Sequence, residues 1–298
     1  MIINGVTIDE TFAEAFPMKG TRIIITAHNV KWAMISAQAF TGFATSVIAC
    51  GCEAGIEREL SASETPDGRP GVAILIFAMG GKGLAKQVET RAGQCVLTSP
   101  TSALFSGLDE EKEMALGQNL RFFGDGFQIS KMIDGKRYWR IPVMDGEFLT
   151  QEKTGVAAAV GGGNFLVLAR SQAQALAACE AAITEMKKIP NVIMPFPGGV
   201  VRSGSKVGSK YKALNASTND AFCPTLKGQT KTDLSPEVES VMEIVIDGLT
   251  KEDIDKAIRV GIAAVCKLGA DNGICRISAG NYGGKLGPYH FHLQEIMA

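Results

Sequence analysis

The first half of the chain alternates short apolar runs with stretches in which apolar residues recur at helical spacing. Residues 72–79 are apolar throughout, which is typical of a strand buried on both faces of a sheet. A turn precedes this strand, because residues 64–71 are dense in glycine, proline and aspartate. The elements that we expect, in chain order, are strand 22–27, a helix through Trp32, Ile35 and Ala39, strand 44–52, strand 72–79, helix 82–92 and strand 94–98. This order is β-α-β-β-α-β.

The second half repeats this order. Ser171 and Thr250 each precede a long amphipathic stretch, which is the position of a helix N-cap. The expected elements are strand 165–169, helix 171–188, strand 192–194, a Gly/Pro/Ser-rich insertion, strand 241–246, helix 250–267 and strand 274–278. Because each half has only about four strands, the pattern favours an α+β protein of two ferredoxin-like (split βαβ) lobes over one doubly wound sheet. We expect the lobes to be residues 1–150 and 151–298, with the boundary near Thr150.

Composition and charge narrow the functional classes. The chain has 298 residues, of which 46% are hydrophobic and 20% charged, as in a globular protein with a sizeable core. It has 30 Lys and Arg against 31 Asp and Glu, which argues against a nucleic-acid or membrane-surface binder that is basic over its whole surface. No apolar run approaches the ~20 residues that span a bilayer. The N-terminus shows no secretory signal, so we expect a cytoplasmic protein.

Cysteine and histidine offer no obvious metal or nucleophile chemistry. The seven cysteines lack the spacing of a disulfide framework, and Cys50 and Cys52 sit in an apolar run that is unlike a zinc knuckle. Of three histidines, His290 and His292 fall on one strand face, but no third ligand is near in the sequence. We therefore expect no metal site and no Ser-His or Cys-His catalysis.

Two glycine clusters resemble nucleotide-binding loops but lack the required context. Residues 161–164 precede a strand, whereas a dinucleotide fingerprint follows a strand and opens a helix. Residues 199–206 carry Ser and Lys in the reverse order to a phosphate-binding loop, and no helix clearly follows them. Glycines that serve turns explain both clusters better.

The insertion in the second half is basic. Residues 186–219 contain six cations and no Asp or Glu; the cations are Lys187, Lys188, Arg202, Lys206, Lys210 and Lys212. Ammonium groups on a flexible, glycine-rich backbone suit a carboxylate or phosphate ligand. A solvated basic loop would show the same composition, so the sequence leaves both interpretations open, and we favour an anionic ligand.

Glu243 is the most unusual acidic residue. It lies in the strand 241–246, where Val241 and Val245 flank it on its own face. A carboxyl group that is desolvated in this way has a raised pKa and holds a proton near neutral pH, as a general acid requires. A surface ion pair on an edge strand would fit the same pattern.

The ordered motifs of the chain resemble the formylmethanofuran:tetrahydromethanopterin formyltransferase family from end to end. The motifs are Thr41–Ile48, Glu53–Glu57, Glu64–Gly71, Gly93–Thr98 and Phe122–Gly126 in the first half, and Gly162–Phe165, Pro195–Gly199, Ser203–Lys206, Glu243–Ile246 and Ile277–Gly287 in the second. The resemblance implies reversible transfer of a formyl group between the amine of a methanofuran-type carrier and N5 of tetrahydromethanopterin. Both carriers would be co-substrates, and no bound prosthetic group is implied.

The resemblance also implies where the site lies and how subunits assemble. The family's reaction-centre carboxylate falls on Glu243. The anionic tails of the carriers suit the basic insertion and the neighbouring motifs, whose candidate substrate-binding residues are Asn164, Arg202, Ser205, Lys206, Lys210, Asn281 and Lys285. Family members are homotetramers with active sites in clefts at subunit interfaces, so we expect a homo-oligomer.

Charge distinguishes branches of the family. Archaeal members are strongly acidic, whereas this chain has a formal net charge of -1 and carries Gly51 and Cys52 where they have a proline-containing turn. It is more similar to the bacterial branch of methylotrophs, whose member is a subunit of a formyltransferase/hydrolase complex. Formyl-hydrolase complex subunits are thus candidate partners. Two alternatives to an enzyme remain, a carrier-binding scaffold without catalysis and a pterin-binding regulator. An assay of formyl transfer distinguishes the enzyme from both.

Overall fold

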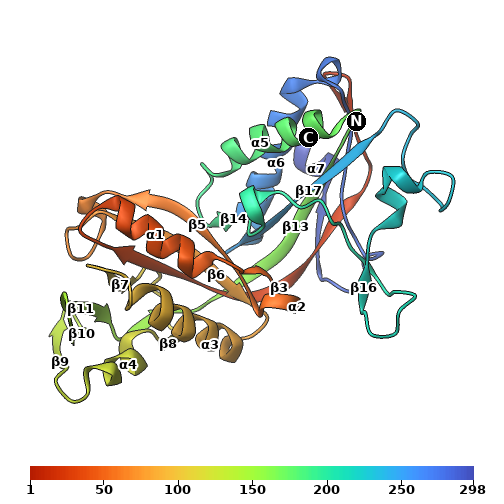
Figure 1. The fold of residues 1–298 in the computed structure, drawn as a ribbon. Helices are drawn as coiled ribbons and strands as arrows, with labels where there is room; N and C mark the ends of the chain where they lie inside the picture. The colour runs from red at the N-terminus through yellow and green to blue at the C-terminus, as the bar shows by residue number, and fades with distance from the viewer. The chain divides into compact units, whose positions relative to one another are not determined.

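The computed structural model describes residues 1–298, which form two compact units. One unit contains Met18–Ala159, and the other combines Met1–Pro17 with Val160–Ala298. The sequence pattern suggests a single boundary near Thr150, whereas the first 17 residues pack with the C-terminal half of the chain. The reason is that β3 (Phe12–Thr26) is one long strand whose first residues pair with β19 (Tyr289–His292) near the C-terminus (Figure 1).

The unit Met18–Ala159 contains the predicted split βαβ topology. Its repeat consists of β3, α1 (Val30–Thr41), β5 (Cys52–Leu60), β6 (Gly71–Ala78), α3 (Gly81–Arg91) and β7 (Ala103–Ser106). The strands lie in the order β5-β6-β3-β7, and every neighbouring pair is antiparallel. This is the strand order of a ferredoxin-like sheet, in which each helix connects two parallel strands that have another strand between them.

A single apolar core joins the helices of this unit to its sheet. All eight residues of β6 are buried, as its uninterrupted apolar run predicts. From α1, Ala33, Ala37 and Phe40 pack into the same core at helical spacing. The helix begins at Asn29, whose side chain accepts a hydrogen bond from the backbone N–H of Trp32.

Two predicted strands of this unit are wrong. Residues 44–52 form a two-residue strand β4 (Thr45–Ser46) and a helical turn α2 (Val47–Cys50), and the long strand β5 begins only at Cys52. Residues 94–96 lie in a π-helical turn, Ala92–Val96, that continues α3, residues 97–98 form a turn, and the fourth strand is β7. Both errors arise because a short apolar run does not distinguish a strand from a buried helical turn.

The unit also carries strands outside the repeat. β7 pairs in parallel with β11 (Gly146–Gln151), which continues through β10 (Lys136–Val143) to the edge strand β9 (Ile129–Ile133). A separate pair joins β8 (Glu113–Ala115) to β12 (Lys153–Gly155), and α4 (Gly117–Leu120) follows β8.

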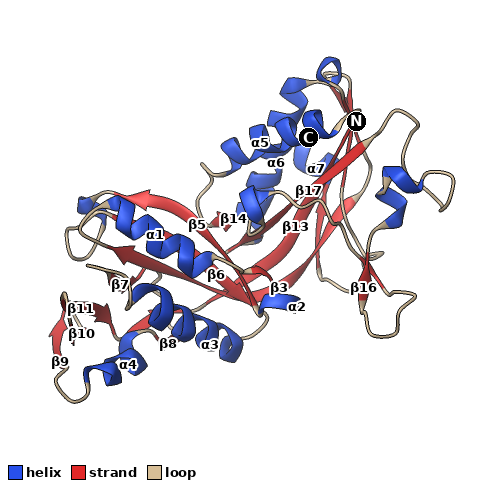
Figure 2. Cartoon of the chain, in the orientation of Figure 1, coloured by secondary structure: helices blue, strands red, loops and turns tan.

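The unit of Met1–Pro17 and Val160–Ala298 repeats the topology. Its elements are β13 (Ala157–Ala169), α5 (Gln172–Met186), β14 (Val192–Ile193), β17 (Ser240–Gly248), α6 (Lys251–Leu268) and β18 (Ile274–Ser278) (Figure 2). The strand order is β14-β17-β13-β18 with antiparallel neighbours, so the prediction of a second ferredoxin-like lobe is confirmed in its topology. The remaining elements are β1 (Ile2–Ile3), β2 (Val6–Ile8), which is parallel to β18, β15 (Lys206–Val207), β16 (Ala216–Ser217), β19 and α7 (Leu293–Met297).

The two long helices of this unit cover one face of its sheet. Ser171 and Thr250 cap α5 and α6, as their positions predict, by accepting hydrogen bonds from the backbone N–H groups of Gln174 and Asp253. The helices approach closely at Gly261, where a Cβ atom would lie 2.6 Å from the Met186 sulfur. None of the helices in the structure is both long and apolar enough to span a bilayer.

Candidate active site

Glu243 lies in the middle of β17, on the face of the sheet away from α5 and α6. Met242 and Ile244, its neighbours in the chain, are buried in the core that the two helices cover. Because successive side chains of a strand point to opposite faces, Glu243 faces the other side. Val241 and Val245 share that face and are half-buried, as Glu243 itself is.

Glu243 is paired on both sides and is not on an edge. It is in register with Leu166 of β13, and on the opposite side it forms a β-bridge with Val201. In the bridge, each backbone N–H of Glu243 and Val201 donates to the other's carbonyl oxygen at 2.8 Å. Its carboxylate makes no recorded ion pair, so the edge-strand ion pair does not describe this residue.

The environment of Glu243 favours the protonated form. Burial raises the pKa of its carboxyl group from 4.5 to about 7, and no charged neighbour or hydrogen bond offsets the loss of water. A carboxyl group with a pKa near 7 exists in both protonation states at neutral pH, as a group that gives and takes protons should.

Part of the chain between β14 and β17 packs on the face on which Glu243 lies. Leu166 and Leu168 of β13 form a small core there with Leu234 and Val238, against which Phe222 also packs. Together with the bridge at Glu243, this cluster shows that the segment from Val201 to the start of β17 returns across the sheet. The bridge places Val201, and with it the start of the predicted anion-binding segment, beside Glu243.

The candidate cations of the insertion differ in their availability. Lys206 is ion-paired, with its Nζ 2.5 Å from Oδ1 of Asp220, an acid just beyond the acid-free segment 186–219. The hydrogen bond from Lys206 lowers the pKa of Asp220. Arg202 and Lys210 are exposed and form no recorded ion pair, and Ser205 is exposed as well. Arg202 and Lys210 are thus more available to an anionic ligand than Lys206 is.

Asn164 connects the Glu243 face to the segment that follows β18. Its buried side chain donates to the carbonyl oxygens of Gly162 and Gly280 and accepts from the Gly280 N–H at 2.7 Å. Asn164 thus uses its amide on the protein's own backbone. Further along, the exposed Asn281 donates to the carbonyl oxygen of Phe12. Lys285 is exposed and forms no recorded ion pair.

Glu14 is a buried carboxylate that the sequence did not single out. It is 1% exposed, and its two oxygens accept four backbone hydrogen bonds from the loop that follows β18. The donors are the N–H groups of Tyr282 at 2.7 Å, Gly284 at 2.8 Å, Leu286 at 2.6 Å and Gly287 at 2.6 Å. Burial alone would raise its pKa, but the four donors lower it to about 2. The sequence signal that points to Glu14 is an acidic residue among the apolar residues of Phe12–Pro17.

His290 and His292 lie on one face of β19, as the spacing predicts. Their imidazole rings lie against the aromatic ring of Phe12. Their ring centroids are 4.7 and 5.2 Å from that of Phe12. No group of three or more His, Cys, Asp or Glu side chains in the structure is arranged to hold a metal ion.

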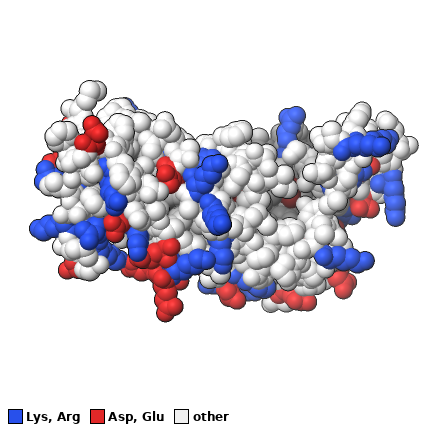
Figure 3. All heavy atoms as spheres, turned by 90° about the horizontal axis from the view of Figure 1, so that it is seen from below, with Lys and Arg blue, Asp and Glu red and all other residues white.

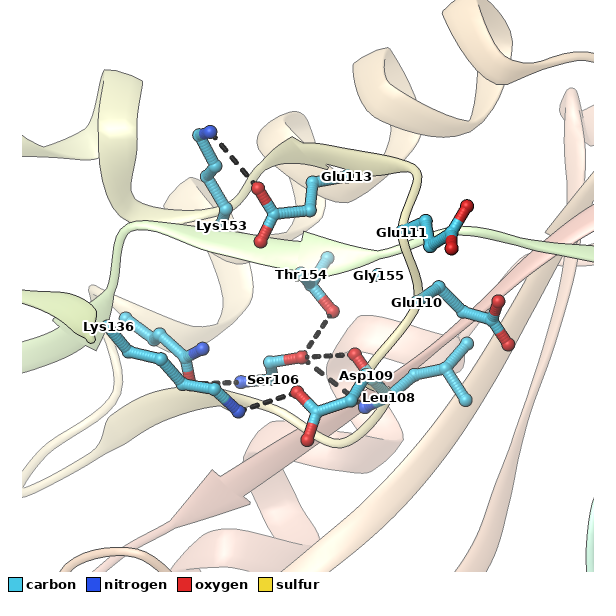
Figure 4. A pocket seen from close by; sticks show the side chains of 11 residues that line it. Ser106, Leu108, Asp109, Glu110, Glu111, Glu113, Lys136, Lys153, Thr154 and Gly155 are labelled. Carbon is cyan, nitrogen blue, oxygen red and sulfur yellow. Dashed lines mark hydrogen bonds and ion pairs between the residues drawn. The ribbon is translucent and has the colours of Figure 1, made fainter. Parts of the chain in front are cut away.

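A polar pocket of about 230 Å³ lies in the other compact unit, lined by the segment from the end of β7 to β8 and by β12 (Figure 4). Four of its charged side chains form ion pairs, Lys136 with Asp109 at 2.5 Å and Lys153 with Glu113 at 3.0 Å. None of the predicted site residues lines it. On the face drawn in Figure 3, basic and acidic side chains are interspersed, in line with the balanced composition.

Comparisons with known proteins agree over the whole chain. The model of the family "Formylmethanofuran-tetrahydromethanopterin formyltransferase" matches residues 1–143, and that of "FTR, proximal lobe" matches residues 146–296. The formylmethanofuran–tetrahydromethanopterin formyltransferase of Methylococcus capsulatus is 80% identical over 298 residues, which is 100% of both chains.

Two solved structures share the fold closely. The formyltransferase/hydrolase complex of Methylorubrum extorquens, in complex with methylofuran, contains a chain that is 51% identical with a TM-score of 0.98, covering 100% of this chain and 99% of that one. The formylmethanofuran:tetrahydromethanopterin formyltransferase of Methanosarcina barkeri is 48% identical with a TM-score of 0.94, covering 99% of this chain and 100% of that one.

Proposed function

The chain belongs to the formylmethanofuran–tetrahydromethanopterin formyltransferase family, and we propose that it transfers a formyl group reversibly between N5 of tetrahydromethanopterin and the amine of a methanofuran-type carrier. The family resemblance inferred from the sequence motifs is confirmed. The observation that carries the proposal within the structure is Glu243, a carboxyl group with a pKa of about 7 that lies beside Val201, at the start of the basic insertion.

Glu243 acts as the general acid and base of the transfer. In one direction, N5 of the pterin attacks the formyl carbon of the carrier's formamide and forms a tetrahedral intermediate. The intermediate collapses by breaking the bond to the carrier nitrogen, which must leave as a neutral amine. The proton lost from N5 is the proton that this nitrogen needs. Glu243 takes the first and supplies the second, so it ends each turnover in its starting protonation state.

The cations near this face bind the anionic tails of the carriers. Arg202 and Lys210 serve this role most directly, because neither has an acidic partner of its own. Lys206 and Ser205 contribute from the same hairpin, although Lys206 must exchange Asp220 for the ligand. Asn281 and Lys285 belong to the loop after β18, and Asn164 holds the start of that loop in place. These groups bind substrate and do not react with it.

The assembly follows the bacterial relatives. A division of the sequence into lobes of residues 1–150 and 151–298 is supported by the junction of the two family models between residues 143 and 146, with residues 1–17 packing in the second unit. We expect a homotetramer, as the family resemblance implies. The Methylorubrum relative belongs to a formyltransferase/hydrolase complex, which supports formyl-hydrolase complex subunits as partners of this chain. It needs no prosthetic group. All seven cysteines are free, which supports a cytoplasmic location.

The test is formyl transfer by the purified chain with both carriers. Turnover should be present without hydrolase subunits and without added metal, and it should run in either direction according to which carrier is formylated. A protein that binds the carriers but exchanges no formyl group would be the scaffold subunit instead.

A further inference from the structure

The loop Asn281–Gly287 takes its shape from a residue at the other end of the chain. Within these seven positions, four backbone N–H groups point inward to the single carboxylate of Glu14, two to each oxygen. A carboxylate binds such donors far more strongly than a neutral amide does, because every hydrogen bond is charge-assisted. The loop is folded around this carboxylate much as a binding loop folds around an anion.

The backbone of the loop requires this close approach. Gly283 and Gly284 have φ angles of 79° and 70°, in the left-handed region that favours glycine. At Gly287, a Cβ atom would lie 2.3 Å from the carbonyl oxygen of Ala15, the residue after Glu14. Even one methyl group there would separate the loop from the strand that carries the carboxylate.

The loop begins at the face on which Glu243 lies. Ser278, the last residue of β18, and Glu243 are both in register with Leu166, so they flank it on the same face at about 10 Å from each other. Asn164, also on β13, then fixes both backbone groups of Gly280. Asn164 therefore fixes the backbone direction at Gly280, and the hydrogen bonds to Glu14 fix the conformation of the residues that follow.

We propose that Glu14 is a positioning residue for carrier binding: its buried carboxylate shapes the loop Asn281–Gly287 and so places the Lys285 ammonium group where it meets the anionic tail of a carrier. The inference rests on the proposed function, because it assumes that Lys285 binds substrate. Lys285 makes no ion pair of its own, so the backbone of the loop is what places it. With a pKa of about 2, Glu14 keeps its charge over the whole range in which the enzyme would work.

A double-mutant cycle tests this role. The dissociation constant of each carrier is measured by titration calorimetry for the wild type, Lys285→Ala, Glu14→Gln and the double variant. In the wild type, Lys285→Ala should weaken one carrier about tenfold or more, the value of a lost charge-assisted contact. In the Glu14→Gln background the same change should weaken it less than about twofold, because the ammonium group is already misplaced.

Glu53→Gln is the matched control. Glu53 is also buried and also accepts a backbone hydrogen bond, from Val47 at 3.1 Å, but it lies in the other compact unit. Lys285→Ala should keep its full effect in that background. If Glu14→Gln does not fold, Glu14→Asp replaces it, since the shorter side chain withdraws the carboxylate from the amides while keeping its charge.

Three results would separate the possibilities. An equal effect of Lys285→Ala with and without Glu14 would overturn the inference and leave Glu14 a purely structural residue. No effect of Lys285→Ala on either carrier in the wild type would overturn it as well. Absence of formyl transfer by the wild type would instead refute the proposed function. That function is tested by turnover, whereas the role of Glu14 is tested by the ratios of the dissociation constants.

Discussion

Replacing Glu243 by glutamine should abolish most activity and at the same time stabilise the fold at alkaline pH. The amide is nearly isosteric with the carboxyl group but neither gives nor takes the transferred proton. Loss of general acid–base help should lower kcat by about 10²–10⁴-fold, with little change in carrier affinity. The stability effect follows from the pKa, and the two effects together distinguish a catalytic carboxyl group from a structural one.

The sign of the stability effect is set by the direction of the pKa change. The folded-state pKa of Glu243 is about 7, against 4.5 for the free side chain, so the folded protein binds the proton more tightly. Wild-type stability therefore falls as the pH rises from about 4.5 to about 7 and stays reduced above that range. At about 1.4 kcal/mol per pH unit, the cost reaches about 3 kcal/mol at pH 8. Glu243→Gln, which cannot ionise, should avoid it.

The assay is denaturant unfolding of both proteins at pH 4.5 and pH 8, alongside kcat. At pH 8 the variant should be the more stable by up to about 3 kcal/mol, and at pH 4.5 the difference should nearly vanish. Glu239→Gln, an exposed carboxylate at the approach to the same strand, should change neither kcat nor the pH dependence. Near-normal turnover of Glu243→Gln would refute the catalytic role, and equal stability at pH 8 would refute the raised pKa.

Three further predictions concern ligand binding, subunit assembly and the stability of the fold. Replacing both Arg202 and Lys210 by alanine should raise the KM for one carrier and leave kcat unchanged. It should also weaken the dependence of that KM on salt, because salt screens exposed charges over ~10 Å at 0.1 M. Measuring KM from about 0.05 to about 0.5 M salt, with a tail-less carrier as control, checks this, and an unchanged salt dependence would contradict it. Dilution below the assembly threshold should lower specific activity, as sedimentation and turnover at matched concentrations would show; a fully active monomer would exclude the tetramer as the working form. Thr250→Ala should cost about 1 kcal/mol by removing the cap of α6, measurable by thermal unfolding, whereas the exposed Thr225→Ala should cost far less.

Local signals explain the parts of the fold that could be predicted from the sequence. Ser171 and Thr250 cap helices through hydrogen bonds to residues only three positions away, so their meaning is contained in the nearby sequence. The apolar run of β6 is equally self-contained. Residues 94–98 are a short apolar run that fits a strand and a buried helical turn equally well, and in the structure Ser36 of α1 donates to the Cys95 carbonyl oxygen in this turn at 2.8 Å, a contact that the local sequence does not reveal.

The candidate site also shows what the local sequence cannot predict, because two acidic residues in similar apolar sequences have pKa values shifted in opposite directions. Glu14 and Glu243 each stand within a strand and have apolar residues on both sides in the sequence. Both lose water on folding, which alone would raise both pKa values. Glu14 meets four N–H donors from a loop about 270 positions away and has a pKa of about 2, whereas Glu243 meets none and has a pKa of about 7. The number of donors is a property of the tertiary fold. The apolar pattern therefore identifies a desolvated acid, and only the structure separates the carboxyl group that we propose for proton transfer from the carboxylate that we propose to shape a loop.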